Sequence, residues 1–228
     1  MGPGPDGGAG MDTVRAAFRD ECARLEQELR DLTGADLDRP TRCPPWTVRD
    51  LLAHVATGVG RLADMLAGPA PERAEVDAAG YFGAAKFTPQ VDRDRIDSAR
   101  RQAPAGVPEV VAGFARAWRA TDAAVAAAPA GRLVRTRHGD AMTLTEFLRT
   151  RVVEVGVHGL DLADALDRRA WLTPTAAEVV ADLLRAGRRV PGWDALTLVR
   201  KATGRAPLTD AERALLDRAG LRGLSFGG

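Results

Sequence analysis

The chain has 228 residues, of which 45% are hydrophobic and 28% charged, as in an ordinary globular protein with a real core. The formal net charge of +1 gives no overall attraction to nucleic acid or to anionic membranes, and no apolar run approaches the roughly 20 residues that span a bilayer. Residues 1–10 are rich in Gly and Pro and lack the basic and apolar segments of a signal peptide, so we expect a disordered tail there. Two cysteines without a Cys-x-x-Cys motif indicate a reduced, cytoplasmic setting.

Apolar residues recur with helical spacing along most of the chain, which predicts an all-α protein. We expect four long helices, at 11–32, 46–66, 107–127 and 144–166, and three shorter ones, at 175–186, 194–203 and 209–218. The sequence shows no internal repeat and no convincing alternating pattern of strands. Such helix lengths and connections fit an antiparallel four-helix bundle at 11–168, followed by a helical C-terminal extension at 169–228.

Two of the long helices have clear N-terminal signals. Thr47 is the expected N-cap of the second helix, and Asp50 takes the place of the usual glutamate in its capping box. Thr143 and Glu146 predict a full capping box for the fourth helix. Residues 69–104, in contrast, show little periodicity, so we expect a long irregular connection of the kind that often contacts substrates.

The fourth helix carries a carboxylate and an imidazole four residues apart, Glu154 and His158. One helical turn separates them, so both point from the same apolar face. On spacing alone they are as consistent with a hydrogen-bonded pair in a core as with two metal ligands. His54, in the second helix, is by itself more typical of a core histidine, but the three side chains converge if these helices are neighbours.

Two imidazoles and one carboxylate form the protein half of a catalytic zinc site, which keeps a fourth position open for water or substrate. A closed structural site would need a fourth protein ligand, usually a cysteine. Cys43 lies outside the pattern, which disfavours the closed version.

Two segments resemble the signatures of a known family. Residues 45–54 (PWTVRDLLAH) are similar to the start of the second helix of the mycothiol-dependent maleylpyruvate isomerase family, and residues 150–163 (TRVVEVGVHGLDLA) to its second signature. This family belongs to the DinB-like four-helix bundles, whose divalent metal is held by a His…Glu-x-x-x-His triad. The resemblance implies a DinB-like bundle here, with His54, Glu154 and His158 as ligands of a metal ion, most simply Zn²⁺.

The resemblance covers about 11–166 and weakens beyond. The maleylpyruvate isomerase carries an additional mixed α/β C-terminal domain, whereas residues 171–228 are too few and too helical for one. Residues 202–205 (ATGR) nevertheless resemble a segment common near the ends of family members. The different C-terminal part leaves the particular isomerase reaction open, while the bundle and the metal site are unaffected.

The resemblance also implies an enzyme that uses mycothiol as a thiol cosubstrate. An open-position zinc can hold a thiol as the thiolate, and no cysteine of this chain is placed to supply it. Attack on a small-molecule electrophile would give S-transfer, or cis–trans isomerisation by addition, rotation and elimination. Arg151, one turn before Glu154, is expected to bind a substrate carboxylate or to orient Glu154. Asp161, one turn after His158, is expected to accept a hydrogen bond from it. Packing or surface roles are equally open for both.

Other functions remain compatible with the sequence. The same open site could activate water in a metal-dependent hydrolase, although no general base is identified. A non-catalytic small-molecule binding protein could retain the same bundle, whereas a zinc-type anti-sigma factor would place cysteines beside the histidine. We expect no nucleic-acid or membrane partner, a monomer or homodimer, and a solvent-facing third histidine, His138.

Overall fold

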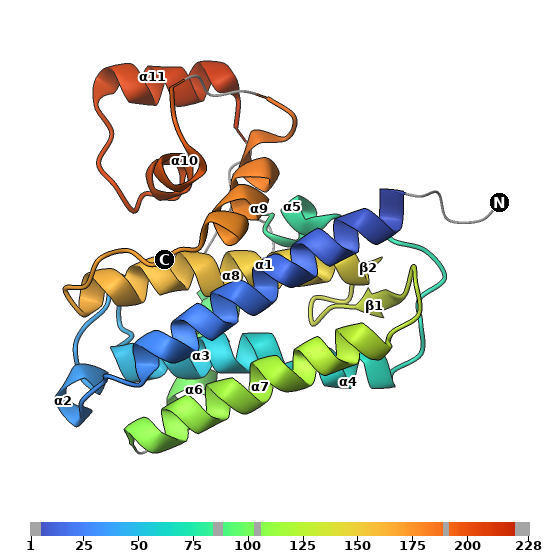
Figure 1. Ribbon diagram of the computed structural model, residues 1–228, viewed down its shortest axis with the longest axis horizontal. Coiled ribbons are helices and arrows are strands. Elements are labelled where there is room, and N and C mark those ends of the chain that lie inside the picture. Colours follow the sequence, from blue (N-terminus) through green and yellow to red (C-terminus); the bar gives the residue numbers. More distant parts are fainter. Residues whose placement is uncertain (1–5, 84–88, 103–105, 189–191, 222–228) are drawn as a thin grey trace.

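The computed structural model describes residues 6–83, 89–102, 106–188 and 192–221, and its centre is a bundle of four helical stretches (Figure 1). They are α1 (Asp6–Leu29), α3 (Val48–Gly60) continued by α4 (Leu62–Ala67), α7 (Val107–Ala127) and α8 (Leu144–Ala165). Both α1 and α3 pack against α7 and α8. The helices that carry His54 and Glu154 are therefore neighbours, which is the condition for their side chains to meet.

Smaller elements complete the fold, and the all-α prediction is confirmed apart from one small sheet. They are α2 (Gly34–Leu37), α5 (Ala78–Tyr81), α6 (Pro89–Gln102), and the antiparallel pair β1 (Leu133–Arg135) and β2 (Ala141–Thr143). The C-terminal extension contains α9 (Pro174–Arg185), α10 (Ala195–Ala202) and α11 (Asp210–Ala219). In the extension α9 packs on α1 and α8, and α10 packs on α9. None of the described helices is long and apolar enough to span a bilayer.

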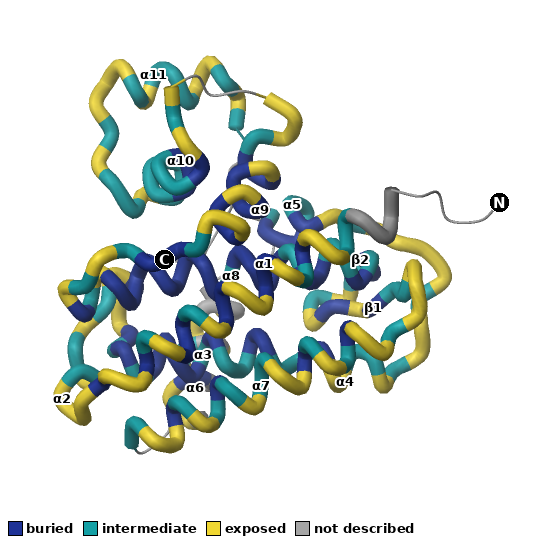
Figure 2. The backbone as a smooth tube through the Cα atoms, in the orientation of Figure 1, coloured by how far each residue is buried: buried dark blue, intermediate teal, exposed yellow. Residues whose placement is uncertain are grey.

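The most deeply buried element is α8, which carries the predicted site. Figure 2 shows it as buried along nearly its whole length. Gly156 permits the C-terminal extension to approach it closely, because a Cβ at that position would lie 2.8 Å from Cδ1 of Leu172. The polar side chains of α8 consequently lie where the effective dielectric constant is low, and their interactions are strengthened. Four valines of this helix are fully buried: Val152, Val153, Val155 and Val157.

The connection at 69–104 contains two helices, so the expectation of an irregular segment is wrong. The short α5 begins at its N-cap Asp77, whose side chain accepts a hydrogen bond from the Gly80 amide. The longer α6 was not predicted because it is highly charged and has a narrow apolar face, in which Ala99 is buried and Ile96 half-buried. α6 packs on α3, and this contact compensates for the weak sequence pattern. Residues 84–88 and 103–105 lie outside the described part of the chain.

Two helix boundaries also differ from expectation. The single helix predicted at 46–66 is divided at Arg61, which is both the C-cap residue of α3 and the N-cap residue of α4. The other difference is at the start of the chain, where α1 already begins at Asp6, inside the tail expected at 1–10.

The cap predictions are partly confirmed. Thr47 and Asp50 form the expected reciprocal capping box of α3. At the start of α8 the side chain of Thr143 accepts a hydrogen bond from the Glu146 amide at 3.2 Å. The reciprocal bond of a capping box, from the Thr143 amide to the Glu146 carboxylate, is replaced by a contact with another element. The Glu146 carboxylate instead accepts from the amide of Ala78 at 2.9 Å and so links α8 to α5.

A buried carboxylate connects the bundle to the C-terminal extension. Glu21 of α1 is fully buried, and its Oε2 accepts from the amide and the hydroxyl of Thr173, the N-cap of α9, at 2.8 and 2.7 Å. Its Oε1 makes no hydrogen bond within the described residues. Burial outweighs the hydrogen bonds to Thr173 and raises the pKa of Glu21 to about 7. The folded protein therefore favours the protonated acid.

We expect Glu21 to make the protein less stable at high pH. Because its pKa is raised from 4.5 to about 7 on folding, its contribution is fully present below pH 4.5 and is lost as the pH rises through 7. At about 1.4 kcal/mol per pKa unit, the loss is at most about 3 kcal/mol. In urea unfolding at pH 5 and pH 8, the free energy of unfolding of Glu21→Gln should change less with pH than that of the wild type. Glu72→Gln, at an exposed position, is the control, and an equal flattening in both variants would contradict the assignment.

Candidate metal centre

The three residues predicted as metal ligands meet between α3 and α8. Nε2 of His54 lies 2.7 Å from Oε1 of Glu154, and Nε2 of His158 lies 3.8 Å from the same oxygen. One donor atom of each residue lies within 4.8 Å of the other two. The carboxylate of Glu154 is thus placed between two imidazoles that come from different helices.

The donor set fits a divalent metal such as zinc. Zinc ligands lie about 2 Å from the ion, so neighbouring ligand atoms of a tetrahedral site are about 3.3 Å apart, between the two distances measured to Glu154. The side chains of His54 and Glu154 keep 14% and 12% of their surface exposed, against 5% for His158. An open fourth position would therefore lie on the side of His54 and Glu154. The ring of Trp46 covers a face of His54, with the ring centroids 4.6 Å apart.

The electrostatics of the cluster favour a positive charge. Burial opposes ionisation of Glu154, but the charge and hydrogen bond of His54 hold its pKa well below the usual range. Burial likewise opposes the charged form of His158, yet the hydrogen bond to Asp161 and the attraction of Glu154 raise its pKa to about 9. The cluster therefore holds an anionic Glu154 beside a His158 that retains its proton, and a cation that binds there would displace the proton of His158.

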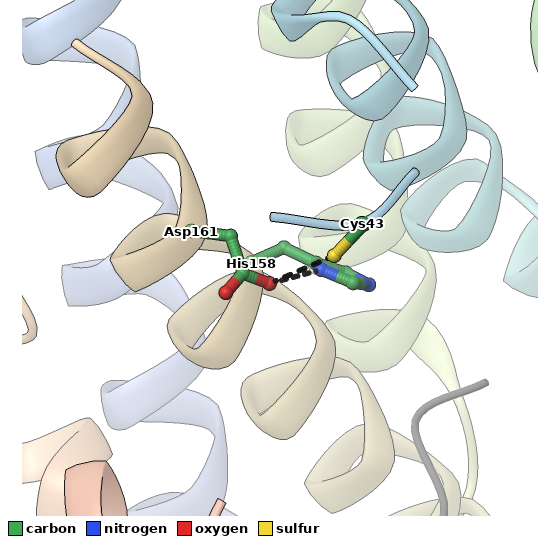
Figure 3. Close-up of side chains that lie close together, drawn as sticks. All are labelled: Cys43, His158 and Asp161. Carbon is green, nitrogen blue, oxygen red and sulfur yellow. Dashed lines mark hydrogen bonds and ion pairs between the residues drawn. The ribbon is translucent and has the colours of Figure 1, made fainter. Parts of the chain in front are cut away.

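Behind the triad, Asp161 fixes the orientation of His158. Its Oδ2 lies 3.0 Å from Nδ1 of His158, which leaves Nε2 on the opposite side of the ring (Figure 3). That Nε2 lies 3.8 Å from Oε1 of Glu154. Arg205 of the C-terminal extension binds both oxygens of Asp161, Nε donating to Oδ1 at 2.9 Å and Nη2 to Oδ2 at 2.8 Å. Burial opposes ionisation of Asp161, but these hydrogen bonds hold its pKa well below the usual range. A carboxylate on Nδ1 makes Nε2 the nitrogen available to a metal.

Cys43 belongs to the same cluster, contrary to the expectation that it lies outside the site. Its thiol donates to Oδ2 of Asp161 at 3.5 Å, and it lies on the Nδ1 side of His158 (Figure 3). These three residues form a second group whose donor atoms lie within 4.8 Å of one another. A metal there is disfavoured because Arg205 already binds both oxygens of Asp161, and Arg42 lies 3.8 Å from Oδ1. The group therefore supports His158 rather than forming a second metal site.

Arg151 is buried and connects Glu154 to the neighbouring elements. Its Nη2 lies 3.8 Å from Oε2 of Glu154 and donates to the hydroxyl of Tyr81 at 3.3 Å. Its Nη1 donates to the carbonyl of Gly58 at 2.9 Å, and its Nε donates to the hydroxyl of Thr150 at 3.1 Å. With every nitrogen engaged by protein groups, the geometry favours the orienting role over the binding of a substrate carboxylate.

Several neighbours of the site were not identified from the sequence. The only signal for Arg205 was the resemblance of residues 202–205 to a family segment, and Cys43 lies just before a matched segment. Tyr81 was visible only as one of few large side chains in its region. His138, expected to face solvent, is half-buried, with its ring centroid 5.4 Å from that of Tyr81.

Comparison with known proteins found a matching family model and similar solved structures. The sequence model described as the mycothiol maleylpyruvate isomerase N-terminal domain matches residues 18–163, which include the whole triad. A crystal structure of a histidine-to-alanine variant of the mycothiol-dependent maleylpyruvate isomerase is similar, with a TM-score of 0.54 and 15% identity over 77% of this chain and 70% of that chain. A second crystal structure of the mycothiol-dependent maleylpyruvate isomerase gives a TM-score of 0.51 with the same identity and coverage. At this identity the likeness establishes the fold. No protein with a curated description matches the chain.

Proposed function

The chain belongs to the mycothiol maleylpyruvate isomerase N-terminal domain family, and on that premise we propose that it is a metal-dependent enzyme whose cosubstrate is mycothiol. The proposed reaction is S-transfer to an electrophilic small molecule, or its cis–trans isomerisation. We assign His54, Glu154 and His158 as the metal ligands. Zn²⁺ is the ion that we propose, because it suits two imidazoles and a carboxylate with one open position.

The convergence of three donor atoms from two helices, backed by Asp161, is the observation that carries this proposal. Buried ionisable groups cost desolvation energy, and a core of the same volume built from apolar residues would be at least as stable. A metal ligand set explains why these groups are present. It also explains why the carboxylate of Asp161 is placed on the far nitrogen of His158.

A divalent metal at this position would hold the thiol of mycothiol as its thiolate, the nucleophilic form at neutral pH. The residues of the chain prepare the position for it. Asp161 fixes the ring of His158, and Arg151 holds the carboxylate of Glu154. Cys43 is buried behind His158 and donates to Asp161, so it does not supply the reacting thiol. A cytoplasmic setting, where a small thiol stays reduced, belongs to the same proposal.

Titration of cobalt-substituted protein with mycothiol tests the proposal. We expect a thiolate-to-cobalt absorption band that grows with the mycothiol concentration and saturates. The matched control is S-methyl mycothiol, which lacks the ionisable thiol and should give no band. Absence of the band at millimolar mycothiol would reject the proposal. Isomerisation and S-transfer are then distinguished by the mycothiol balance, because isomerisation regenerates the thiol and transfer consumes it.

The alternatives lack a supporting contact. A metal-dependent hydrolase needs a general base beside the metal. Within the described residues, the carboxylates at the triad are Glu154, assigned as a ligand, and Asp161, already bound by His158 and Arg205. A non-catalytic binding protein would bind mycothiol but leave the electrophile unchanged, which analysis of the electrophile for isomerised or S-linked product reveals.

A further inference from the structure

Two further residues share the face of α3 that carries His54. Gly58 and Arg61 follow it by four and seven residues, so all three project from one side of the helix. Helical geometry continues through Arg61, whose φ is −63° and ψ is −19°. The face is turned toward α8, because a Cβ on Gly58 would lie 3.0 Å from Nη1 of Arg151. Arg61 therefore extends this face two turns beyond His54.

Arg61 is half-buried, and its side chain makes no hydrogen bond or ion pair with any residue in the described part of the chain. Burial lowers its pKa, and the charges of Arg137 and Arg151 act in the same direction. Tyr81 and Glu154 act in the opposite direction but do not outweigh them. A partly desolvated guanidinium in cationic surroundings costs free energy, which an anionic ligand would recover.

The groups around Arg61 form a continuous set of contacts that starts at the triad. Arg151, which adjoins the triad, donates to the hydroxyl of Tyr81 at 3.3 Å. The ring of Tyr81 lies 5.4 Å from that of His138 between the centroids, and Nε of Arg137 donates to Nε2 of His138 at 3.2 Å. Arg61 interacts electrostatically with Arg137, Tyr81 and Arg151. Side chains from α3, α5, α8 and the β-hairpin thus gather on one side of the metal centre.

We propose that Arg61, Arg137 and Tyr81 form an oxyanion-binding subsite beside the triad, which takes a carboxylate of the substrate that reacts there. Three guanidinium groups, those of Arg61, Arg137 and Arg151, share this region with the carboxylate of Glu154. The region is therefore positive, and a divalent metal would make it more so. Guanidinium groups match a carboxylate with two parallel donors. The hydroxyl of Tyr81 accepts from Arg151, so its own proton can be donated to the ligand.

The subsite depends on the proposed function in one respect only, namely that the bound carboxylate belongs to the substrate of the proposed reaction. The subsite itself is built from the chain, so it can be tested with simple anions, with and without metal. The probes are maleate, its neutral analogue dimethyl maleate, and inorganic phosphate, each titrated calorimetrically. The variants are Arg61→Gln, Arg61→Lys and Arg137→Gln. Arg30→Gln, which removes the same charge from a position with 67% of its side chain exposed, is the control.

We expect maleate to bind the wild type, and Arg61→Gln to weaken this binding about tenfold or more, as for the loss of a charged hydrogen bond. Arg61→Lys should retain part of the affinity, and Arg137→Gln should lose less because Arg137 is exposed. The affinity for dimethyl maleate should be the same in every variant. Competition between phosphate and maleate would support a general oxyanion site. Equal maleate affinity in Arg61→Gln and the wild type, equal weakening in Arg30→Gln, or binding of phosphate alone would overturn the proposal.

Metal content, measured in the same samples, separates the two proposals. If the wild type holds no metal but Arg61 still controls maleate binding, the assigned metal centre fails and the subsite stands. If the metal is present and Arg61→Gln changes nothing, the subsite fails and the proposed function stands. Thermal unfolding of Arg61→Gln is expected to match the wild type, since no protein partner of Arg61 is lost in the described residues.

Discussion

Replacement of His158 by alanine is expected to reduce the bound metal from close to one ion per chain to a small fraction of that amount. His158 is the most deeply buried of the three ligands, and its ring is fixed by Asp161, so it is the best oriented donor of the set. His54→Ala should have a similar effect, because two protein ligands rarely hold a divalent ion against dialysis. Metal analysis by plasma emission after dialysis of the purified variants measures this directly.

The chain offers a matched control, because it contains only three histidines. His138→Ala removes the one that lies in the β-hairpin region and should leave the metal content unchanged. Circular dichroism and thermal unfolding distinguish ligand loss from misfolding, and His54→Ala is the less disruptive of the two ligand variants because His54 is more exposed. Full occupancy in both folded variants would show that the triad is a hydrogen-bonded cluster instead.

The second large effect is expected from the link between the C-terminal extension and the metal centre. Asp161→Asn keeps the shape of the side chain but removes the charge that holds His158 and Arg205. Loss of such a partner behind a ligand histidine typically weakens metal binding about 10- to 100-fold. Arg205→Ala should weaken it as well, because Asp161 loses both of the hydrogen bonds that Arg205 donates to it. Arg205→Lys should give an intermediate effect, since a lysine cannot bind the carboxylate in the same two-pronged way.

Competition with a chromophoric zinc chelator measures these affinities. Asp164→Asn is the control, because Asp164 lies on the same helix, has 48% of its side chain exposed, and pairs only at 3.5 Å with Arg42 in the described structure. We expect its zinc affinity to remain within about twofold of the wild type, as for a surface ion pair. If Asp161→Asn left the zinc affinity unchanged, the contact between Asp161 and His158 would make no contribution to metal binding.

Local patterns in the sequence were sufficient for most of the bundle. Helical periodicity located α1, α3, α7 and α8, and side-chain caps located the start of α3 and of α8 within one or two residues. These features depend on neighbours within about one turn, so they can be read without knowing the rest of the fold. The same is true of Glu154 and His158, because spacing along one helix fixes their common face. α6 escaped prediction because its weak apolar face gains its stability from contact with α3.

The sequence by itself therefore determined the four long helices of the bundle and the common face of Glu154 and His158, but not what completes the site. His54 joins them only because α3 and α8 pack side by side. Arg205 reaches Asp161 across 44 residues, and Cys43 reaches it across 118. Contacts between segments so far apart leave no periodic trace in the chain. They are decided when the apolar faces of separate helices are buried together, and that packing turned an ambiguous pair of side chains into a candidate metal centre.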